Sequence, residues 1–212
     1  MIDYKEKFEK MRIAGNLAAR TLDMLTENIK EGISTDYIDK LGYEFIRDNG
    51  GYSAPLYYRG FTKSLCTSLN RVVCHGIPSE RILQDGDAVN VDVTAIIDEH
   101  YGDTSRMFSI GKTQVKLNNL IEATYEAMMK AIKILKPGIK LGDIGYEIQS
   151  YVEERGFSVV RDFCGHGIGK SFHLNPNILH YGKAGTGMRV TEGMIFTIEP
   201  MINLGKFETK TL

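Results

Sequence analysis

Acidic residues in strand-like surroundings are the first features of this sequence that suit metal chemistry. Asp92 and Asp103 stand eleven residues apart, on what reads as the two arms of one hairpin. With a turn near Ile97-Asp98, the two carboxylates fall close to opposite each other on one face, and directly opposed residues lie about 5 Å apart. Adjacent acids repel unless a proton or a cation lies between them. The alternative interpretation is an exposed hairpin face with solvated acids.

Histidines could complete such a site. His166 lies between glycines in CGHGIG, His173 follows seven residues later, and His75 precedes a glycine in VVCHGIP. Small neighbours leave an imidazole open to a ligand, although an irregular turn with a hydrogen-bonded histidine would look the same. The remaining histidines are interpreted as surface or core residues without a chemical role: His100 and His180.

An internal repeat adds another carboxylate. LQDGDAVNVD (83–92) aligns with VTEGMIFTIE (190–199) at an offset of 107 residues, which places Asp92 on Glu199. KEGISTDYI (30–38) aligns with KPGIKLGDI (136–144) at an offset of 106. The two offsets predict a duplicated unit whose near two-fold symmetry brings the two acids together. The alternative is chance similarity between glycine-containing strands.

The elements that must position these residues follow from hydrophobic periodicity. Four helices are predicted, at about 4–29, from the Ser34-Thr35-Asp36 N-cap to Gly50, at 117–135 and at 141–154. Strands are predicted at 88–97 and 101–110 with Asp98-Glu99 as turn residues, and strand-like runs at 157–163 and 194–202. Helix, helix, strands, twice over, predicts an α+β fold with helices on one face of an antiparallel sheet.

Composition excludes several classes of protein. The 212 residues are 42% hydrophobic and 25% charged, which is ordinary for a globular domain. A net charge of −1 gives no electrostatic case for nucleic acid or an anionic membrane. The charged start lacks a secretory signal, and no apolar run approaches the ~20 residues of a membrane span. Three cysteines without a C-x-x-C pair argue for a reducing cytosol, so a cytoplasmic location is expected.

Four segments carry a resemblance to a known family: VVCHGIP, NVDVT…GDTSRMF, GHGIG…FH and FTIEPM. In this order and spacing, and over essentially the whole chain, they resemble type I methionine aminopeptidases of metallopeptidase family M24, the bacterial and organellar form. The resemblance implies the pita-bread α+β fold, a pseudo-two-fold duplication of helix-helix-strand units around a central antiparallel sheet. It predicts one catalytic domain over 1–212, with halves at about 1–110 and 111–212.

The same resemblance implies roles for particular residues. It assigns two divalent ions, drawn from Co, Mn, Fe and Zn, to Asp92, Asp103, His166 and Glu199. His75 would hydrogen-bond the scissile amide nitrogen, His173 the developing oxyanion, and Glu199 would also shuttle protons. The methionine pocket would be formed by Tyr58, Phe61, Cys66 and Phe172.

The implied activity is metal-dependent hydrolytic removal of the N-terminal methionine from nascent proteins, with a preference for a small second residue. The implied partners are nascent polypeptide N-termini, which makes the ribosome a candidate partner; we expect a monomer and find no nucleic-acid motif. Two alternatives stay open: an Xaa-Pro aminopeptidase or prolidase on the same fold, and a non-catalytic pita-bread protein that binds peptides.

The family also has a fifth ligand, a glutamate in a motif resembling SAQFEHT, and a pocket tryptophan. Neither occurs in this sequence, which ends at Leu212. The repeat agrees, because the counterpart of Asp103 would fall near position 210 with a loop still to cross. We therefore expect a chain that lacks its C-terminal strands and whose four-ligand site holds metal weakly and supports little activity.

Overall fold

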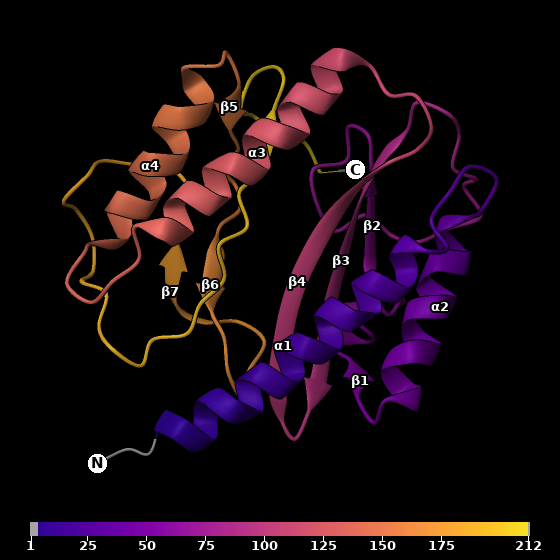
Figure 1. Cartoon of the computed structure of the whole chain (residues 1–212), viewed down its shortest axis with the longest axis horizontal. Helices are drawn as coiled ribbons and strands as arrows, with labels where there is room; N and C mark the ends of the chain where they lie inside the picture. Colours follow the sequence, from indigo (N-terminus) through magenta and orange to yellow (C-terminus); the bar gives the residue numbers. More distant parts are fainter. Residues whose placement is uncertain (1–3, 212) are drawn as a thin grey trace. The chain divides into compact units, whose positions relative to one another are not determined.

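The computed structural model describes residues 4–211 and consists of two compact units (Figure 1). The first comprises the chain up to Gln114 together with Gly169–Phe172, and the second comprises Val115–Ile168 together with the chain from His173 onward. Each unit contains helices and antiparallel strands, so the expected α+β class is confirmed. None of the described helices is both long and apolar enough to span a membrane.

The first unit is built around one long hairpin. Its elements are α1 (Tyr4–Thr26), α2 (Thr35–Asp48), β1 (Tyr52–Ser53), the 3-10 turn η1 (Tyr58–Gly60), β2 (Cys66–Leu69), β3 (Ala88–Ile97) and β4 (His100–Ser109). β4 pairs along one edge of β3, and β1 and β2 follow each other along the other edge. The expected N-cap of α2 is confirmed, since the Ser34 side chain accepts a hydrogen bond from the Tyr37 N–H.

The hairpin turn sets the register of the two acids. Asp98 and Glu99 form a two-residue turn with φ of 49° and 61°, a left-handed conformation typical of such turns and unsuited to a β-branched residue such as Ile97. Asp92 therefore pairs with Ser105, not Asp103. The acids share a face but are diagonal neighbours, so the prediction that they lie nearly opposite each other is wrong by two residues.

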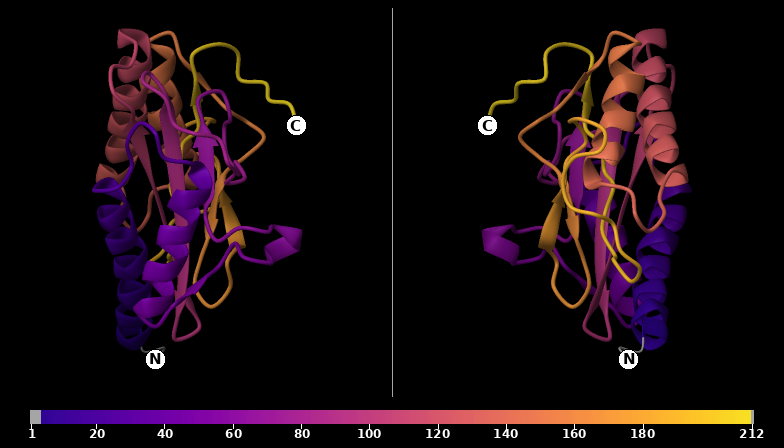
Figure 2. Two further views of the ribbon diagram at one scale, coloured as in Figure 1. Left: turned by 90° about the vertical axis from the view of Figure 1, so that its right-hand side faces the viewer. Right: turned by 90° about the vertical axis from the view of Figure 1, so that its left-hand side faces the viewer.

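The two faces of this sheet have different roles. Three valines of β3, at 89, 91 and 93, are fully buried on the face that α1 covers. On the same face, a Cβ added to Gly102 would lie 2.1 Å from the Ala14 carbonyl carbon, so α1 packs directly on the strand backbone. The opposite face carries Asp92, Tyr101 and Asp103. Figure 2 shows η1 on this opposite side of the sheet from α1.

The second unit has shorter strands. It contains α3 (Val115–Lys133), α4 (Leu141–Glu153), β5 (Ser158–Val159), β6 (Gly165–Gly167), β7 (Leu174–Ile178) and β8 (Ile202–Asn203). β5 pairs with β8, and β6 pairs with β7 through an irregular register. Its core lies beneath the two helices and is formed by Ala127, Ala131, Ile144, Ile148, Val152 and Ile178.

The expected strands at 157–163 and 194–202 are largely wrong. β5 covers two residues, and 194–202 forms one isolated bridge, between Gly167 and Phe196, before β8 begins. Thr197 explains part of this loss, because its hydroxyl rather than its carbonyl accepts the N–H of His166. A ladder whose backbone partners are replaced by side chains does not continue as a regular strand.

The predicted repeat recurs in the local backbone of each unit. The N–H of Gly32 donates to Leu83 O at 2.9 Å, and the N–H of Gly138 donates to Val190 O at 2.8 Å. Both glycines have positive φ, 90° and 103°, which a side chain would disfavour. The isolated bridges Ser34–Ile82 and Lys140–Arg189 repeat the same offsets. The duplication inferred from sequence is therefore present in the turn that joins the two helices of each pair.

Candidate metal and substrate site

The two aspartates of the first unit are half-buried on the open face of the β3–β4 hairpin. Thr94 donates its hydroxyl to Asp103 Oδ1 at 3.1 Å, which orients that carboxylate. Cys66 on β2 pairs opposite Asp92. Burial, followed by the charge of Asp92, raises the pKa of the Cys66 thiol well above its ordinary value. A thiol that stays protonated is a poor metal ligand, so the carboxylates are the candidate donors on this face.

His75 lies in a loop that is attached to β2. Its φ of 55° is left-handed, a strained conformation for a residue other than glycine. The next position requires glycine, because a Cβ added to Gly76 would lie 2.2 Å from Thr67 O. The loop is fixed by the Thr67 N–H to Gly76 O and the Gly76 N–H to Ser68 Oγ. Desolvation lowers the pKa of His75, although the residue keeps exposed surface, and this favours its neutral form.

Three aromatic rings gather in the first unit. The Tyr58 and Phe172 rings are 5.1 Å apart at 56°, and Phe172 stacks on Tyr101 at 5.6 Å and 22°. Phe61 belongs to the same loop as Tyr58 and donates its N–H to Tyr58 O. The structure thus brings together two of the predicted pocket residues and adds Tyr101. Strand alternation was the available signal for Tyr101, because it lies two residues before Asp103 on β4.

The glycines around His166 are explained by backbone packing in the second unit. A Cβ on Gly165 would lie 2.4 Å from Thr197 O, and one on Gly167 would lie 2.4 Å from Asn175 O. Neighbouring segments therefore close on β6 from both sides. The buried His166 side chain lies between these segments. Close backbone packing therefore explains the G-H-G motif better than ligand access to the imidazole does.

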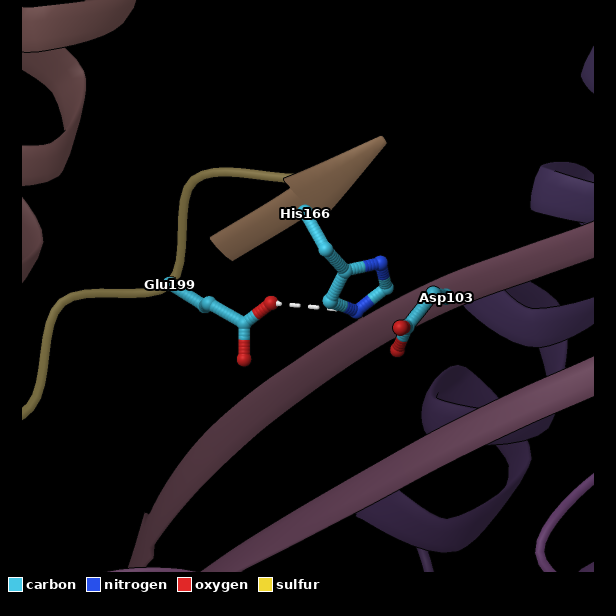
Figure 3. Close-up of side chains that lie close together, drawn as sticks. All are labelled: Asp103, His166 and Glu199. Carbon is cyan, nitrogen blue, oxygen red and sulfur yellow. Dashed lines mark ion pairs between the residues drawn. The ribbon is translucent and has the colours of Figure 1, made fainter. Parts of the chain in front are cut away.

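The hydrogen bonding of His166 indicates the tautomer of its ring. Nδ1 lies 3.0 Å from Gly167 O, and since a carbonyl only accepts, Nδ1 carries a proton. In the neutral ring the lone pair of Nε2 then faces Glu199 Oε1 at 3.6 Å (Figure 3). Two acceptors facing each other require a proton or a cation between them. Ligands that each bind one metal at about 2.1 Å in tetrahedral geometry are about 3.4 Å apart, so the pair fits a divalent ion.

Glu199 is held at two points. Thr197 donates its hydroxyl to Oε1 at 2.5 Å, and the Glu199 N–H donates to His180 Nε2 at 3.1 Å. His180 is only 1% exposed, and burial lowers its pKa to about 4, so the ring is a neutral acceptor. The interpretation of His180 as a surface or core residue without a chemical role therefore missed its contact with Glu199. Its position nineteen residues upstream gave no sequence signal for that contact.

His173 lies beside His166. The ring centroids are 4.2 Å apart at 50°, and His173 is exposed where His166 is buried. Both line a hollow of about 380 Å³ in the second unit, together with Cys164, Leu174, Asn175 and Asn177. An exposed imidazole beside a buried one can contact a substrate while the buried one holds an ion.

The donors suit a borderline or hard divalent metal. Among the described residues, Asp103 of the first unit and His166 and Glu199 of the second each offer one atom that a metal ion can bind. Carboxylates with one imidazole match Mn²⁺, Fe²⁺, Co²⁺ or Zn²⁺ better than metals that prefer thiolates. All three cysteines are free thiols, and desolvation raises the pKa of Cys164 as well as that of Cys66.

Comparison with known proteins agrees with this chemistry. The sequence pattern of metallopeptidase family M24 matches residues 9–210. The chain belongs to metallopeptidase family M24. A methionine aminopeptidase of Rickettsia prowazekii is 54% identical over 208 residues, which are 98% of this chain and 80% of the relative. The crystal structure of methionine aminopeptidase from R. prowazekii matches with a TM-score of 0.96, covering 97% of this chain and 83% of that one.

A prolidase from Pyrococcus furiosus shows how far the fold extends. It matches with a TM-score of 0.80 at 24% identity, covering 92% of this chain and 56% of that one. At that identity the likeness concerns the fold alone. The expected pita-bread α+β fold is thus confirmed, and sequence identity favours the methionine aminopeptidases over the prolidases as the relevant relatives.

Proposed function

We propose that this chain is a metal-dependent aminopeptidase that removes the N-terminal methionine from nascent proteins, with a preference for a small second residue. The observation that carries the proposal is His166, whose Nδ1 is bound to Gly167 O while Nε2 faces the Glu199 carboxylate. A metal-binding histidine characteristically donates its other ring nitrogen in this way. The 54% identity to a methionine aminopeptidase supplies the substrate class.

The proposed ligands of two divalent ions are Asp92 and Asp103 of the first unit and His166 and Glu199 of the second. Support comes from the shared face of the two aspartates, the facing pair of His166 and Glu199, and membership of a metallopeptidase family. When bound, such ions polarise a peptide carbonyl and make water acidic enough to attack it near neutral pH.

The remaining polar groups act on the substrate. His75, whose pKa is lowered by desolvation, can accept the N–H of the scissile amide through one ring nitrogen and donate through the other. His173 is proposed to donate to the oxygen on which negative charge develops. The Glu199 carboxylate is proposed to take a proton from the attacking water and return it to the leaving amine, in addition to its role as a ligand.

The aromatic residues are proposed to bind the methionine side chain. Tyr58 and Phe172 already pack together, and a thioether contacts aromatic rings favourably. Phe61 shares the Tyr58 loop, and the protonated Cys66 thiol adds a small apolar wall. Since nascent N-termini are made on ribosomes, the proposed place of action is the cytoplasm.

A substrate panel tests the proposal. Metal-free protein would be reloaded in turn with Co²⁺, Mn²⁺, Fe²⁺ and Zn²⁺ and assayed for release of the first residue from Met-Gly-Met-Met, Leu-Gly-Met-Met, Met-Leu-Met-Met and Ala-Pro peptides. Because four ligands should hold the metal weakly, we expect turnover to be slow. It should depend on added metal, on Met at the first position and on Gly at the second. Faster cleavage of Ala-Pro would support the prolidase alternative, and peptide binding without turnover would support the non-catalytic one.

A further inference from the structure

We infer that His180 is a positioning residue for Glu199, whose backbone N–H it accepts and whose carboxylate it thereby holds toward His166. The inference deepens the proposed function and rests on it, because Glu199 is there a metal ligand. It concerns a histidine that sequence reasoning assigned to the core or the surface.

The backbone ladder ends just before Glu199. Two ladder hydrogen bonds precede it: Ile168 N–H to Ile195 O at 3.2 Å and Thr197 N–H to His166 O at 2.9 Å. In an antiparallel ladder the next N–H of this series belongs to Glu199, and its partner would be the carbonyl of Cys164. The imidazole of His180 accepts that N–H instead, at 3.1 Å. A side-chain acceptor thus replaces the backbone carbonyl at Glu199, where the regular strand pairing ends.

His180 is well placed to fix this position. It follows the end of β7, two residues after the fully buried Ile178, and is itself 1% exposed. A ring so enclosed has little rotational freedom, so Nε2 is a fixed acceptor. Thr197 holds the other end of the same residue by donating to Oε1. With both ends fixed, Oε1 lies 3.6 Å from His166 Nε2.

The acceptor role requires an unprotonated Nε2. The hydrogen bond that the Glu199 N–H donates to Nε2 shows that state directly, because a protonated ring nitrogen could not accept it. The competing explanation is that His180 merely satisfies a backbone donor for folding. That role would change the stability of the metal-free protein and leave its affinity for metal intact.

Two matched amides separate these explanations. In His180→Gln the side-chain amide reaches the position of Nε2 and can still accept the Glu199 N–H. In His180→Asn the amide is one methylene shorter and falls near the position of Nδ1, away from that N–H. Both keep a polar side chain of similar volume. A third variant, His180→Leu, removes the acceptor altogether.

The readout is Co²⁺ binding to the metal-free protein, monitored by the visible absorption of the bound ion. The thermal midpoint of the metal-free protein is measured in parallel. We expect His180→Asn and His180→Leu to raise the Kd about tenfold and to alter the absorption spectrum, in line with other residues that orient a ligand. His180→Gln should stay within about threefold of the parent. Wild-type affinity in His180→Asn, or equal losses in the Gln and Asn variants, would overturn the inference.

Glu199→Gln separates this inference from the proposed function. If Glu199→Gln binds Co²⁺ as the parent does, Glu199 is not a ligand and the proposed function fails at that residue. If Glu199→Gln binds weakly while His180→Asn binds normally, the proposed function stands and the role of His180 fails. The exposed Glu192→Gln is the control and should bind Co²⁺ as the parent does.

Discussion

The two acids that the repeat aligns are held in different ways. In the first unit, Asp92 lies within an unbroken ladder, paired with Ser105 on one side and Cys66 on the other. In the second unit, Glu199 lies in no regular strand and is fixed by the side chains of Thr197 and His180. The position of Asp92 therefore depends on many backbone hydrogen bonds, whereas that of Glu199 depends on two side chains.

The same contrast holds for the elements around them. β3 and β4 pair without a break over ten residues each, while the β6–β7 register shifts between His166 and Gly167. Yet the turns that join the two helices of each pair are similar, as the hydrogen bonds and positive φ angles of Gly32 and Gly138 show. Duplication has kept the local turn chemistry, which depends on a few residues. It has not kept the length of the strands, which depends on partners far away in the chain.

The largest expected effect is loss of the aligned acids themselves. We expect Asp92→Asn and Glu199→Gln each to lower kcat/KM by at least about a hundredfold and to reduce the bound metal, since each removes a charged donor. The measurements are methionine release and metal content. Asp98→Asn, in the exposed hairpin turn, and Glu192→Gln are the matched controls. Full activity in either variant would contradict the proposal that Asp92 and Glu199 have equivalent roles as metal ligands.

Because α1 packs closely on the first sheet, alanine replacements of Gly102 and Gly15 should change the free energy of unfolding in opposite directions. Gly102→Ala places a Cβ 2.1 Å from the Ala14 carbonyl carbon, so helix or strand must shift, and we expect a loss of about 2 kcal/mol in the free energy of unfolding. Gly15→Ala, on α1 with nothing within 4 Å of its added Cβ, should instead stabilise by about 0.5–1 kcal/mol. Urea unfolding measures both. If Gly15→Ala were also destabilising, steric crowding at Gly102 alone would not explain the difference between the two glycines.

The sequence predicted best what depends on local periodicity. The strand at 88–97 agrees with β3 residue for residue because its valines alternate with polar residues, and the helices are within about three residues of their predicted ends. The strand at 194–202 fails because Thr197 and His180 replace backbone partners there. The Tyr101–Phe172 stack and the His180 contact with Glu199 join segments distant in the chain, and no single-sequence pattern encodes such contacts.

Each unit places a threonine hydroxyl on one acid, and the two threonines should differ in importance. Thr94 donates to Asp103, whereas Thr197 donates to Glu199 and also accepts the His166 N–H at 2.9 Å. Thr197→Val leaves that N–H unsatisfied, so we expect about a tenfold rise in the Kd for Co²⁺, against about threefold for Thr94→Val. Equal effects would mean that the ladder around Asp103 positions it no better than side chains position Glu199.

The smallest expected effect concerns acid stability. Burial alone would raise the pKa of Asp87, but hydrogen bonds from Asn70, the Gln84 N–H and Arg81 hold it below its ordinary value of 3.8. Asp143, in the second unit, also has a lowered pKa, from the N–H groups of Gly185 and Lys140, but it is only half-buried whereas Asp87 is buried.

The folded pKa of Asp87 lies below the unfolded one, so the unfolded state binds more protons in acid. The contribution of Asp87 to the free energy of unfolding is therefore complete above pH 3.8 and is lost as the pH falls through the folded pKa. We expect Asp87→Asn to lower the free energy of unfolding by about 1 kcal/mol at pH 7 and to flatten its decline at acid pH. Asp143→Asn should change that decline much less, because water screens this less buried carboxylate more than it screens Asp87. Urea unfolding of metal-free protein from pH 7 to pH 3 compares the two variants, and an unchanged acid slope in Asp87→Asn would show that its hydrogen bonds do not outweigh its burial.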